Sequence, residues 1–540
     1  MTGQKKEKEM TTEIKETQTE QPFSYDTLPY PNHTFHHISP EHIESIGTVF
    51  GISAAKASTA RILELGCGSG LNSIAFASRH SKAKAIGVDM SKVQIAHGKK
   101  YIESLKLNNV ELKAMSIMDI DKSFGEFDYI ICHGVFSWVP AEVQKKILDV
   151  INTHLAPNGI AHVSYNALPG WNIAQTFRDM MQYHADMFIS DQDKLQQAGA
   201  FVQFIDSALA ESDTPYSKFL RQEAQIVASQ DSSYVKHEYL DKGNSQFYFS
   251  DFANLAAQHG LAYLGDSSLS TMYLGNLPVK ASEALKAIDN IVAAEQYMDF
   301  ITNRRFRNTL LCKANTKINR NINPDIFDKL HVASRIIPAT HISKVNFEDE
   351  TSALSFTMDG GTASFNTASC ILKAAFYTFA EHQGKFLSID ELCNAVAKKL
   401  PQNNPETLTH ALKSQLIQIL FQGIIEIRAT APASIDKVSA KPTTSMIARY
   451  EISAGEYGVT NEYSNSIPLN LVQKLVIFYA NGENTIDQII DNVLSHVIKG
   501  ELTLNVDNKT VSEKLEQRKI IEDTVKTTLE VLKNNYYLVG

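Results

Sequence analysis

The stretch I-L-E-L-G-C-G-S-G-L-N, residues 62–72, joins a short apolar run to three glycines at alternate positions. Because glycine has no Cβ, Gly66 and Gly68 allow a tight strand-to-helix turn and let backbone N–H groups approach a ligand at a helix N-terminus. A dinucleotide fingerprint reads G-x-G-x-x-G, whereas Gly70 comes one residue early here and Leu71 occupies the third-glycine position. The turn therefore indicates a nucleotide-like ligand and disfavours a dehydrogenase, although alone it is also compatible with a purely structural turn.

Apolar runs and amphipathic stretches alternate on both sides of this turn, which is typical of βαβ units. Strands are expected at 61–67, 84–90, 110–115, 127–134, 160–167, 261–266 and 305–312. Helices are expected from Gly70, over 91–107 with Ser91 as N-cap, over 141–155 and over 250–260. The sequence thus predicts an α/β fold with a doubly wound, mostly parallel sheet of seven strands.

Residues 172–245 differ from their surroundings because they are polar, amphipathic and almost without strand signal. We expect them to form a helical insertion within one α/β domain. The alternative of two independent domains that meet near residue 190 stays open.

A weak internal repeat follows residue 345, where 372–396 resembles 472–494. Each copy reads as an apolar helix, a glycine-containing turn and S/T-I-D at the start of a second helix, and each is followed by a third helix, at 408–427 and 520–539. We expect two α+β, winged-helix-like modules, with chance similarity between amphipathic helices as the alternative.

Composition limits the class of protein. The 540 residues carry 60 acidic and 51 basic side chains, which gives a formal charge of -9. Electrostatic binding to nucleic acid through the overall charge is therefore not expected. The five scattered cysteines favour a reducing, cytoplasmic location over a disulfide framework or a zinc knuckle. No apolar run is long enough for a membrane span, and residues 1–20 indicate a disordered polar tail without the apolar core of a signal peptide.

Two aspartates follow the glycine turn at the ends of predicted strands. Asp89 ends the second strand, where a carboxylate can accept hydrogen bonds from both ribose hydroxyls. Asp119 comes just past the third strand and is placed to bind an exocyclic adenine amine. Either one alone could be a helix cap, but together with the turn they favour a nucleoside site.

These residues, followed by F-D-Y-I-I-C-H-G-V-F-S-W-V at 127–139, resemble the ordered motifs of class I S-adenosylmethionine-dependent methyltransferases. The resemblance implies that Gly66 and Gly68 pass beneath the methionine part of the cofactor, with Asp89 at the ribose and Asp119 at the adenine. The implied cofactor-binding residues are Glu64, Gly66, Cys67, Gly68, Asp89, Met90, Met118, Asp119, His133 and Tyr30. The resemblance also offers a role for Tyr25 and Tyr30 in closing over the cofactor; their alternative role is to pack this segment down.

A narrower resemblance covers nearly the whole chain. Residues 24–43, 164–171 and 234–266 are similar to methyltransferases with a regulatory domain, and most similar to the rickettsial protein-lysine methyltransferases that modify outer membrane protein B. The resemblance implies a cytoplasmic homodimer acting on an extended or unfolded outer membrane protein. The expected domains are a tail at 1–20, the first part of the S-adenosylmethionine-binding core at 21–171, a dimerising insertion at 172–245, the second part of the core at 246–315, a middle domain at 316–435 and a C-terminal domain at 436–540.

The end of the fourth strand restricts the methyl acceptor. Methylation of a base or an amide usually uses (D/N)-P-P-Y there, whereas this chain has His133, Gly134, Val135 and Phe136. Adenine and glutamine are therefore disfavoured as acceptors.

A lysine amine is compatible with these residues as the methyl acceptor. Transfer requires a neutral amine, and an apolar aromatic channel lowers a lysine pKa and attracts cations by cation–π interaction. The candidate catalytic side chains are Phe136, Trp138, Tyr165 and Trp171, which follow the fourth and fifth strands. Core packing is the alternative role, especially for Phe136 and Trp171, and no dedicated base is required if proximity and desolvation suffice.

Other candidates are weaker. His33, His36 and His37 lack acidic or cysteine partners nearby in sequence, so we expect no metal site. Arg304, Arg305 and Arg307 could meet an acidic substrate or be paired internally. The competing functions are a small-molecule methyltransferase and a non-catalytic winged-helix regulator that senses S-adenosylmethionine.

Overall fold

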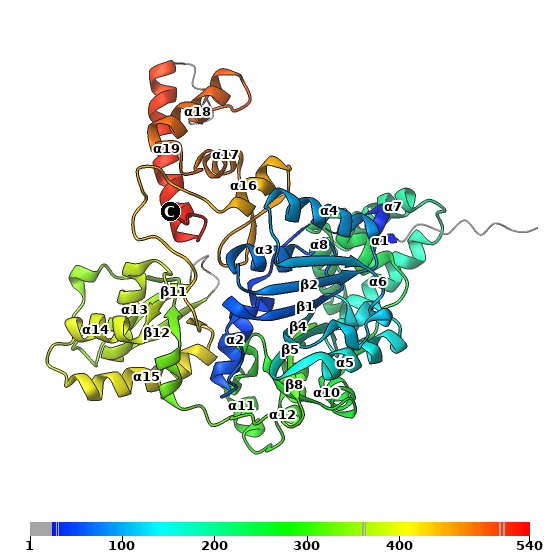
Figure 1. The fold of residues 1–540 in the computed structure, drawn as a ribbon. Helices are drawn as coiled ribbons and strands as arrows, with labels where there is room; N and C mark the ends of the chain where they lie inside the picture. Colours follow the sequence, from blue (N-terminus) through cyan, green and yellow to red (C-terminus); the bar gives the residue numbers. More distant parts are fainter. Residues whose placement is uncertain are drawn as a thin grey trace, which may run out of the picture.

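The computed structural model describes residues 24–28, 30, 32–358, 361, 363–506, 509–510 and 513–540. The tail expected at residues 1–20 lies outside the described residues. An α/β core, a middle module and a C-terminal module follow one another along the chain (Figure 1).

The core is one sheet with the strand order β3-β2-β1-β4-β5-β8-β7, and the two-residue strand β6 pairs with β5. The strands are β1 (Arg61–Leu65), β2 (Lys84–Asp89), β3 (Val110–Ala114), β4 (Phe127–Cys132), β5 (Leu155–Ala167), β6 (Gln246–Phe247), β7 (Leu261–Asp266) and β8 (Phe306–Lys313). The pairs among β1–β5 are parallel, whereas β8 runs antiparallel to both β5 and β7. The mostly parallel sheet is as predicted, with β6 in addition to the seven expected strands.

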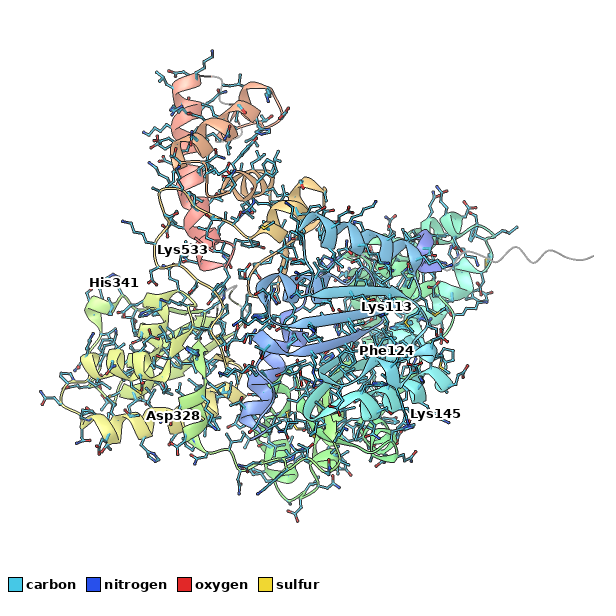
Figure 2. The ribbon with its side chains drawn as sticks, viewed as in Figure 1. Lys113, Phe124, Lys145, Asp328, His341 and Lys533 are labelled. Atoms are coloured by element: carbon cyan, nitrogen blue, oxygen red, sulfur yellow. The ribbon has the colours of Figure 1, made fainter. Side chains whose placement is uncertain are left out.

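Helices cover both faces of this sheet (Figure 1). They include α2 (Pro40–Val49), α3 (Leu71–Arg79), α4 (Lys92–Ser104), α5 (Ala141–His154), α10 (Phe249–Gln258), α11 (Val279–Leu285) and α12 (Ile291–Thr302). Ser91 caps α4 as predicted, since its Oγ accepts the backbone N–H of Gln94 at 3.1 Å. On α5 the apolar Ile147 and Ile151 are buried, whereas Lys145 on the outer side is exposed (Figure 2).

The connection into β5 differs from the prediction. Residues 156–159 were expected to separate a helix from a strand starting at residue 160, but α5 ends at His154 and β5 begins at Leu155. Leu155 pairs with Phe127, and the register shifts before Tyr129 pairs with Ile160. The additional residues are thus accommodated as an irregularity within the strand pair.

The edge strand β3 carries Lys113, whose Nζ lies 5.6 Å from the ring centre of Phe124 (Figure 2). A lysine on an edge strand discourages pairing with another chain.

The helical segment after β5 consists of α6 (Trp171–Ala185), α7 (Asp191–Ala208), α8 (Pro215–Ala228), α9 (Ser232–Tyr234) and the π-helix η6 (Val235–Leu240). Its helices share a small core that includes Phe177, Met181, Val202 and Leu220. Strands β6–β8 come after these helices in sequence and complete the sheet that β1–β5 begin.

Among the described residues, the middle module contains three α-helices and the C-terminal module contains four. The helices of the middle module are α13 (Cys370–His382), α14 (Ile389–Lys399) and α15 (Pro405–Phe421). One of its sheets consists of β13 (Leu387–Ser388), β9 (His331–Ala333) and β14 (Glu426–Arg428). Its second sheet consists of β10 (Ile336–Pro338), β11 (Leu354–Met358) and β12 (Ser364–Thr367). In the C-terminal module, α16 (Met446–Ser453) and the pair β15 (Gly458–Thr460) and β16 (Ser466–Pro468) precede α17 (Leu471–Tyr479), α18 (Ile486–Ile498), β17 (Asn505–Val506), β18 (Lys509–Thr510) and α19 (Lys514–Asn534).

The repeated S/T-I-D motif has the same local structure in both modules. Ser388 with Glu391 forms a capping box at α14, and Thr485 with Gln488 forms one at α18. The reciprocal hydrogen bonds satisfy backbone N–H groups that the first helical turn leaves unpaired.

Both modules contact the core. Helix α2 lies beside the middle module, where Ala429 N–H donates to Ser45 Oγ at 2.9 Å (Figure 1). The C-terminal module lies over α3 and α4, and Tyr450 packs edge-on against Tyr101 at 4.6 Å between ring centres (Figure 1). A cavity of about 10 Å³ between Phe76 of the core and Ser464 is too small for more than one water molecule. No helix within the described part of the chain is long and apolar enough to cross a membrane.

Candidate active site

The glycine turn between β1 and α3 adopts backbone angles that only glycine takes up readily. Gly66, Gly68 and Gly70 have φ values of 69°, 57° and 74°. A Cβ on Gly66 would lie 2.3 Å from Cγ2 of Val135, and one on Gly68 would lie 2.8 Å from Oε1 of Gln94. The turn is therefore a compact cradle in which a side chain would displace its neighbours or a ligand.

Asp89 at the end of β2 is held beside this cradle. Its Oδ2 accepts the N–H of Gly68 and its Oδ1 accepts the N–H of Ser91, both at 2.8 Å. Burial raises the pKa of Asp89 above its usual value, and these hydrogen bonds oppose that rise. A carboxylate oxygen has a second lone pair, so the fixed Asp89 can still accept hydrogen bonds from two ribose hydroxyls.

The neighbouring positions fit the adenosine part of the cofactor. Asp119 is exposed in the short helix η3 (Ile117–Asp119), and Asp89 pairs in register with Ala114 of β3, so both carboxylates lie at the same edge of the sheet. Met90 and Met118 are 59% and 45% exposed at that edge. Two flexible apolar side chains in water next to a carboxylate offer a surface that a flat purine ring can cover.

Glu64 and Cys67 lie on the interior side of the turn. Glu64 is 4% exposed and accepts hydrogen bonds from the side chains of Asn72 and Ser73, which tie β1 to α3. Burial raises the pKa of Glu64, against the opposing hydrogen bonds from Ser73 and Asn72, and it raises the pKa of the Cys67 thiol. These two side chains support the turn from within, so contact with a cofactor would have to come from their backbone.

A segment before α2 lies along the outer side of the turn. The Ser69 hydroxyl donates to Oδ1 of Asn32, and the N–H of Phe35 donates to Oδ1 of Asn72 at 3.1 Å. Tyr30, two residues before Asn32, reaches across to Glu238 of η6, where its hydroxyl donates to Oε1 at 3.1 Å. The side chain of Tyr25 lies outside the described residues.

The same segment also reaches the C-terminal module. Asn32 Nδ2 donates to Glu456 at 3.3 Å, the N–H of Thr34 donates to Ser466 Oγ at 3.1 Å, and His36 Nδ1 pairs with Asn465 Oδ1 at 3.0 Å. The sequence gives no local signal for Asn32, because it stands in an irregular segment whose partners are distant in the chain.

His133, one of the residues expected to bind the cofactor, directly follows β4. Its ring packs against Phe35 at 5.0 Å and His37 at 5.4 Å between centres. Burial lowers the pKa of His133 to about 4, so its imidazole is neutral at physiological pH. Gly134, with φ 68°, donates its N–H to Ser164 Oγ at 2.8 Å and turns the chain away from the sheet.

The two tryptophans predicted at the acceptor site lie together. Their rings are edge-on at 6.4 Å between centres, and the guanidinium of Arg178 on α6 lies 5.9 Å from the Trp138 ring. Trp138 is half-buried, whereas Trp171 is 7% exposed and its buried Nε1 has no hydrogen-bond partner among the described residues. Arg178 could not be recognised from sequence because it lies in the middle of an amphipathic helix.

Phe136 and Tyr165 require a correction, because both are fully buried instead of facing an acceptor. Phe136 packs edge-on against Phe252 at 5.3 Å, and Tyr165 stacks on Phe252 at 4.0 Å. The Tyr165 hydroxyl is hydrogen-bonded to Thr309 Oγ1 at 3.1 Å. These two rings fill the space between the sheet and α10, which is the packing role that remained open for Phe136.

The three arginines near β8 are paired internally. Arg304 binds Asp266 at 3.1 Å, Arg305 binds Glu223 at 2.5 Å, and Arg307 binds Asp299 at 2.7 Å and Glu295 at 3.0 Å. They stabilise the core and the helical segment and do not form an open basic surface.

The histidines contact aromatic rings. His33 lies 6.4 Å from Phe35, His36 stacks on Tyr463 at 5.3 Å, and His37 lies near His133. Within the described ranges, no group of three or more His, Cys, Asp or Glu side chains could hold a metal ion.

Three family models match the chain. Residues 56–216 match a "Methyltransferase domain", residues 231–313 a "Predicted methyltransferase regulatory domain", and residues 440–537 a "PKMT, C-terminal winged helix domain". These ranges include the glycine turn, the π-helix and the module of α16–α19.

Whole-chain relatives agree with these matches. An uncharacterized protein of Rickettsia prowazekii (strain Madrid E) is 41% identical over 516 residues, which cover 95% of this chain and 93% of the relative. A second protein of that organism is 50% identical over 43% of this chain and 93% of its own length. The structure of PKMT2 from Rickettsia typhi in complex with AdoHcy superposes with a TM-score of 0.86 at 40% identity and covers 95% of this chain and 100% of that one. The chain belongs to the same family of S-adenosylmethionine-dependent protein methyltransferases as PKMT2.

Proposed function

We propose that this enzyme transfers the methyl group of S-adenosylmethionine to lysine ε-amines of a protein. The observation that carries the proposal is the placement of Trp138 and Trp171 after the strands β4 and β5, whose carboxyl ends adjoin the glycine cradle. Gly66, Gly68, Asp89, Met90, Met118 and Asp119 would hold the cofactor, and the bound cofactor supplies an electrophilic methyl group.

The side chains near the acceptor suit an aliphatic amine. An ammonium group has no lone pair, so the lysine must lose a proton before it can react. A low-dielectric, aromatic environment favours the neutral amine, and the face of Trp138 attracts the methylated cation. His133 stays neutral and therefore does not repel a cationic side chain.

The substrate we propose is an outer membrane protein in an extended or unfolded state, encountered in the cytoplasm before export. Support comes from the resemblance of residues 24–43, 164–171 and 234–266 to rickettsial enzymes with that substrate. An extended chain can bring many lysines in turn to one site.

We also propose a homodimer formed through the helical segment at 172–245. Large apolar side chains are exposed on it, including Tyr183, Met187, Ile189, Phe204 and Tyr216, with Ile189 99% exposed. Exposed apolar groups on neighbouring helices favour burial against a second copy. Sedimentation velocity on the full chain measures the oligomeric state.

The decisive experiment is mass spectrometry of an unfolded outer membrane protein after incubation with the enzyme and isotopically labelled S-adenosylmethionine. We expect labelled methyl groups on lysine side chains. The matched control is the same substrate with acetylated lysines, which should remain unlabelled. Unmodified lysines together with label on a small molecule or on another residue type would contradict the proposal.

A further inference from the structure

The π-helix η6 brings a carboxylate, Glu238, to the border between the cofactor cradle and the tryptophan pair. π-Helical turns are rare and occur frequently at functional sites. Tyr30, which donates its hydroxyl proton to Glu238 Oε1 at 3.1 Å, belongs to the segment whose Asn32 binds Ser69 of the glycine turn. Glu238 is therefore connected to the cofactor side of the site.

The acceptor side contacts η6 as well. Nε of Arg178 donates to the backbone carbonyl of Glu238 at 2.9 Å, and the same guanidinium faces Trp138. Just after η6, the N–H of Ser245 donates to the carbonyl of Ser137, next to Trp138, at 2.7 Å. These contacts hold the backbone of η6 beside the acceptor side, while the hydrogen bond from Tyr30 holds the Glu238 carboxylate.

The charge of this carboxylate is not balanced by an ion pair within the described residues. Arg178 directs its N–H groups to the backbone carbonyls of Glu238 and Asp241. Burial raises the pKa of Glu238 to about 7, against the opposing effects of the Tyr30 hydrogen bond and of the charges on Arg178 and His237. On η6 and α9, the buried phenols of Tyr239 and Tyr234 are also near, and their raised pKa values keep them neutral.

A half-buried carboxylate without a partner cation is costly to ionise, and an entering cation lowers that cost. The ε-ammonium of a substrate lysine is such a cation. A carboxyl group whose pKa is close to 7 can exchange a proton with that lysine near physiological pH.

We propose that Glu238 is a catalytic residue that binds the ε-ammonium of the substrate lysine and removes its proton. This inference rests on the proposed lysine acceptor and adds the base that the sequence did not require. One N–H proton moves to the Glu238 carboxylate, which leaves a lone pair on nitrogen. That pair forms the bond to the methyl carbon while the carbon–sulfur bond breaks and its electrons stay on sulfur. The products are a methylammonium and a neutral thioether, and Glu238 returns its proton to water.

The first test is Glu238→Gln in the full chain, because glutamine keeps the shape but cannot accept the proton. We expect kcat to fall about 100-fold, with unchanged affinity for S-adenosylhomocysteine. In the wild type kcat/KM should rise with pH through about 7, as Glu238 loses its proton. In Glu238→Gln this rise of kcat/KM with pH should be absent. Glu238→Asp should restore part of the rate together with the pH-dependent rise.

The matched control is Asp179→Asn, which removes an exposed carboxylate from α6 beside Arg178. It should keep the wild-type rate and pH profile. Tyr30→Phe provides a second test, because loss of its hydrogen bond raises the pKa of Glu238. The rise of kcat/KM with pH should therefore move to higher pH.

The outcomes separate the two proposals. If the wild type methylates lysine and Glu238→Gln keeps the wild-type rate and profile, the role of Glu238 is wrong and the proposed function stands. If the wild type methylates only other groups, the proposed function itself fails. If circular dichroism shows that Glu238→Gln is unfolded, the pH profile of Tyr30→Phe decides instead. A rise of kcat/KM at the same pH as in the wild type would then overturn the inference.

Discussion

The two halves of the site are built differently. The cofactor half, from β1 to β3, consists of a backbone turn and residues at strand ends that are close together in sequence. The acceptor half that we propose, around β4 and β5, combines Trp138, Arg178 and Glu238, which lie far apart in the chain, and Tyr30 links it to the cofactor half. A local pattern therefore describes the first half, whereas only the folded chain brings the second half together.

The largest effect is expected at Asp89 in the cofactor half. Asp89→Ala removes the two charge-assisted hydrogen bonds that we propose to ribose, each of about 1.5 kcal/mol, and frees the N–H groups of Gly68 and Ser91. Affinity for S-adenosylhomocysteine should fall at least about 100-fold by isothermal titration calorimetry. The control is Asp121→Ala, which removes an exposed carboxylate near Asp119. Unchanged affinity in Asp89→Ala would break the assignment of this half.

A smaller effect is expected at Trp138 in the acceptor half. Trp138→Ala removes a cation–π surface of about 1 to 2 kcal/mol, so kcat should fall roughly 10-fold. The affinity for S-adenosylhomocysteine should stay within about two-fold if the halves are separate. Trp138→Phe keeps an aromatic face and should recover most of the rate. A parallel loss of cofactor affinity in Trp138→Ala would show that the halves are not independent.

The smallest effect on activity is expected behind the acceptor half, at Tyr165. Tyr165→Phe removes the hydrogen bond to Thr309 and should lower the free energy of unfolding by about 1 kcal/mol in a urea titration. Its kcat should equal that of the wild type, because the ring lies in the core. A large loss of kcat with little loss of stability would instead restore Tyr165 to the acceptor site.

The strand pattern and the glycine spacing predicted the sheet, and the aspartates at its edge, because both depend on short-range periodicity. The position after the strand ends selected Trp138 and Trp171, whose rings lie together, but the same reasoning selected Phe136 and Tyr165, which are fully buried against α10. A strand or a turn determines where a residue stands, whereas the packing of α10 against the sheet determines which aromatic rings it covers.

Glu238 illustrates a different limit. Its sequence context, Y-V-K-H-E-Y-L, was part of the family resemblance, yet nothing in it distinguishes a solvent-facing carboxylate from one placed in the site. The distinction arises from the π-helical turn and from Tyr30, 208 positions away. Likewise, the internal pairing of Arg304, Arg305 and Arg307 depends on acids of β7, α8 and α12.

The segment around Asn32, Thr34 and His36 has a thermodynamic consequence, because it bonds to the glycine turn and to the C-terminal module at once. We expect this shared segment to couple the cofactor site to the C-terminal module, and a coupling between two binding sites is reciprocal. A cofactor that orders this segment tightens the docking of the C-terminal module. By the same factor, a protein substrate that repositions that module alters the affinity for the methyl donor.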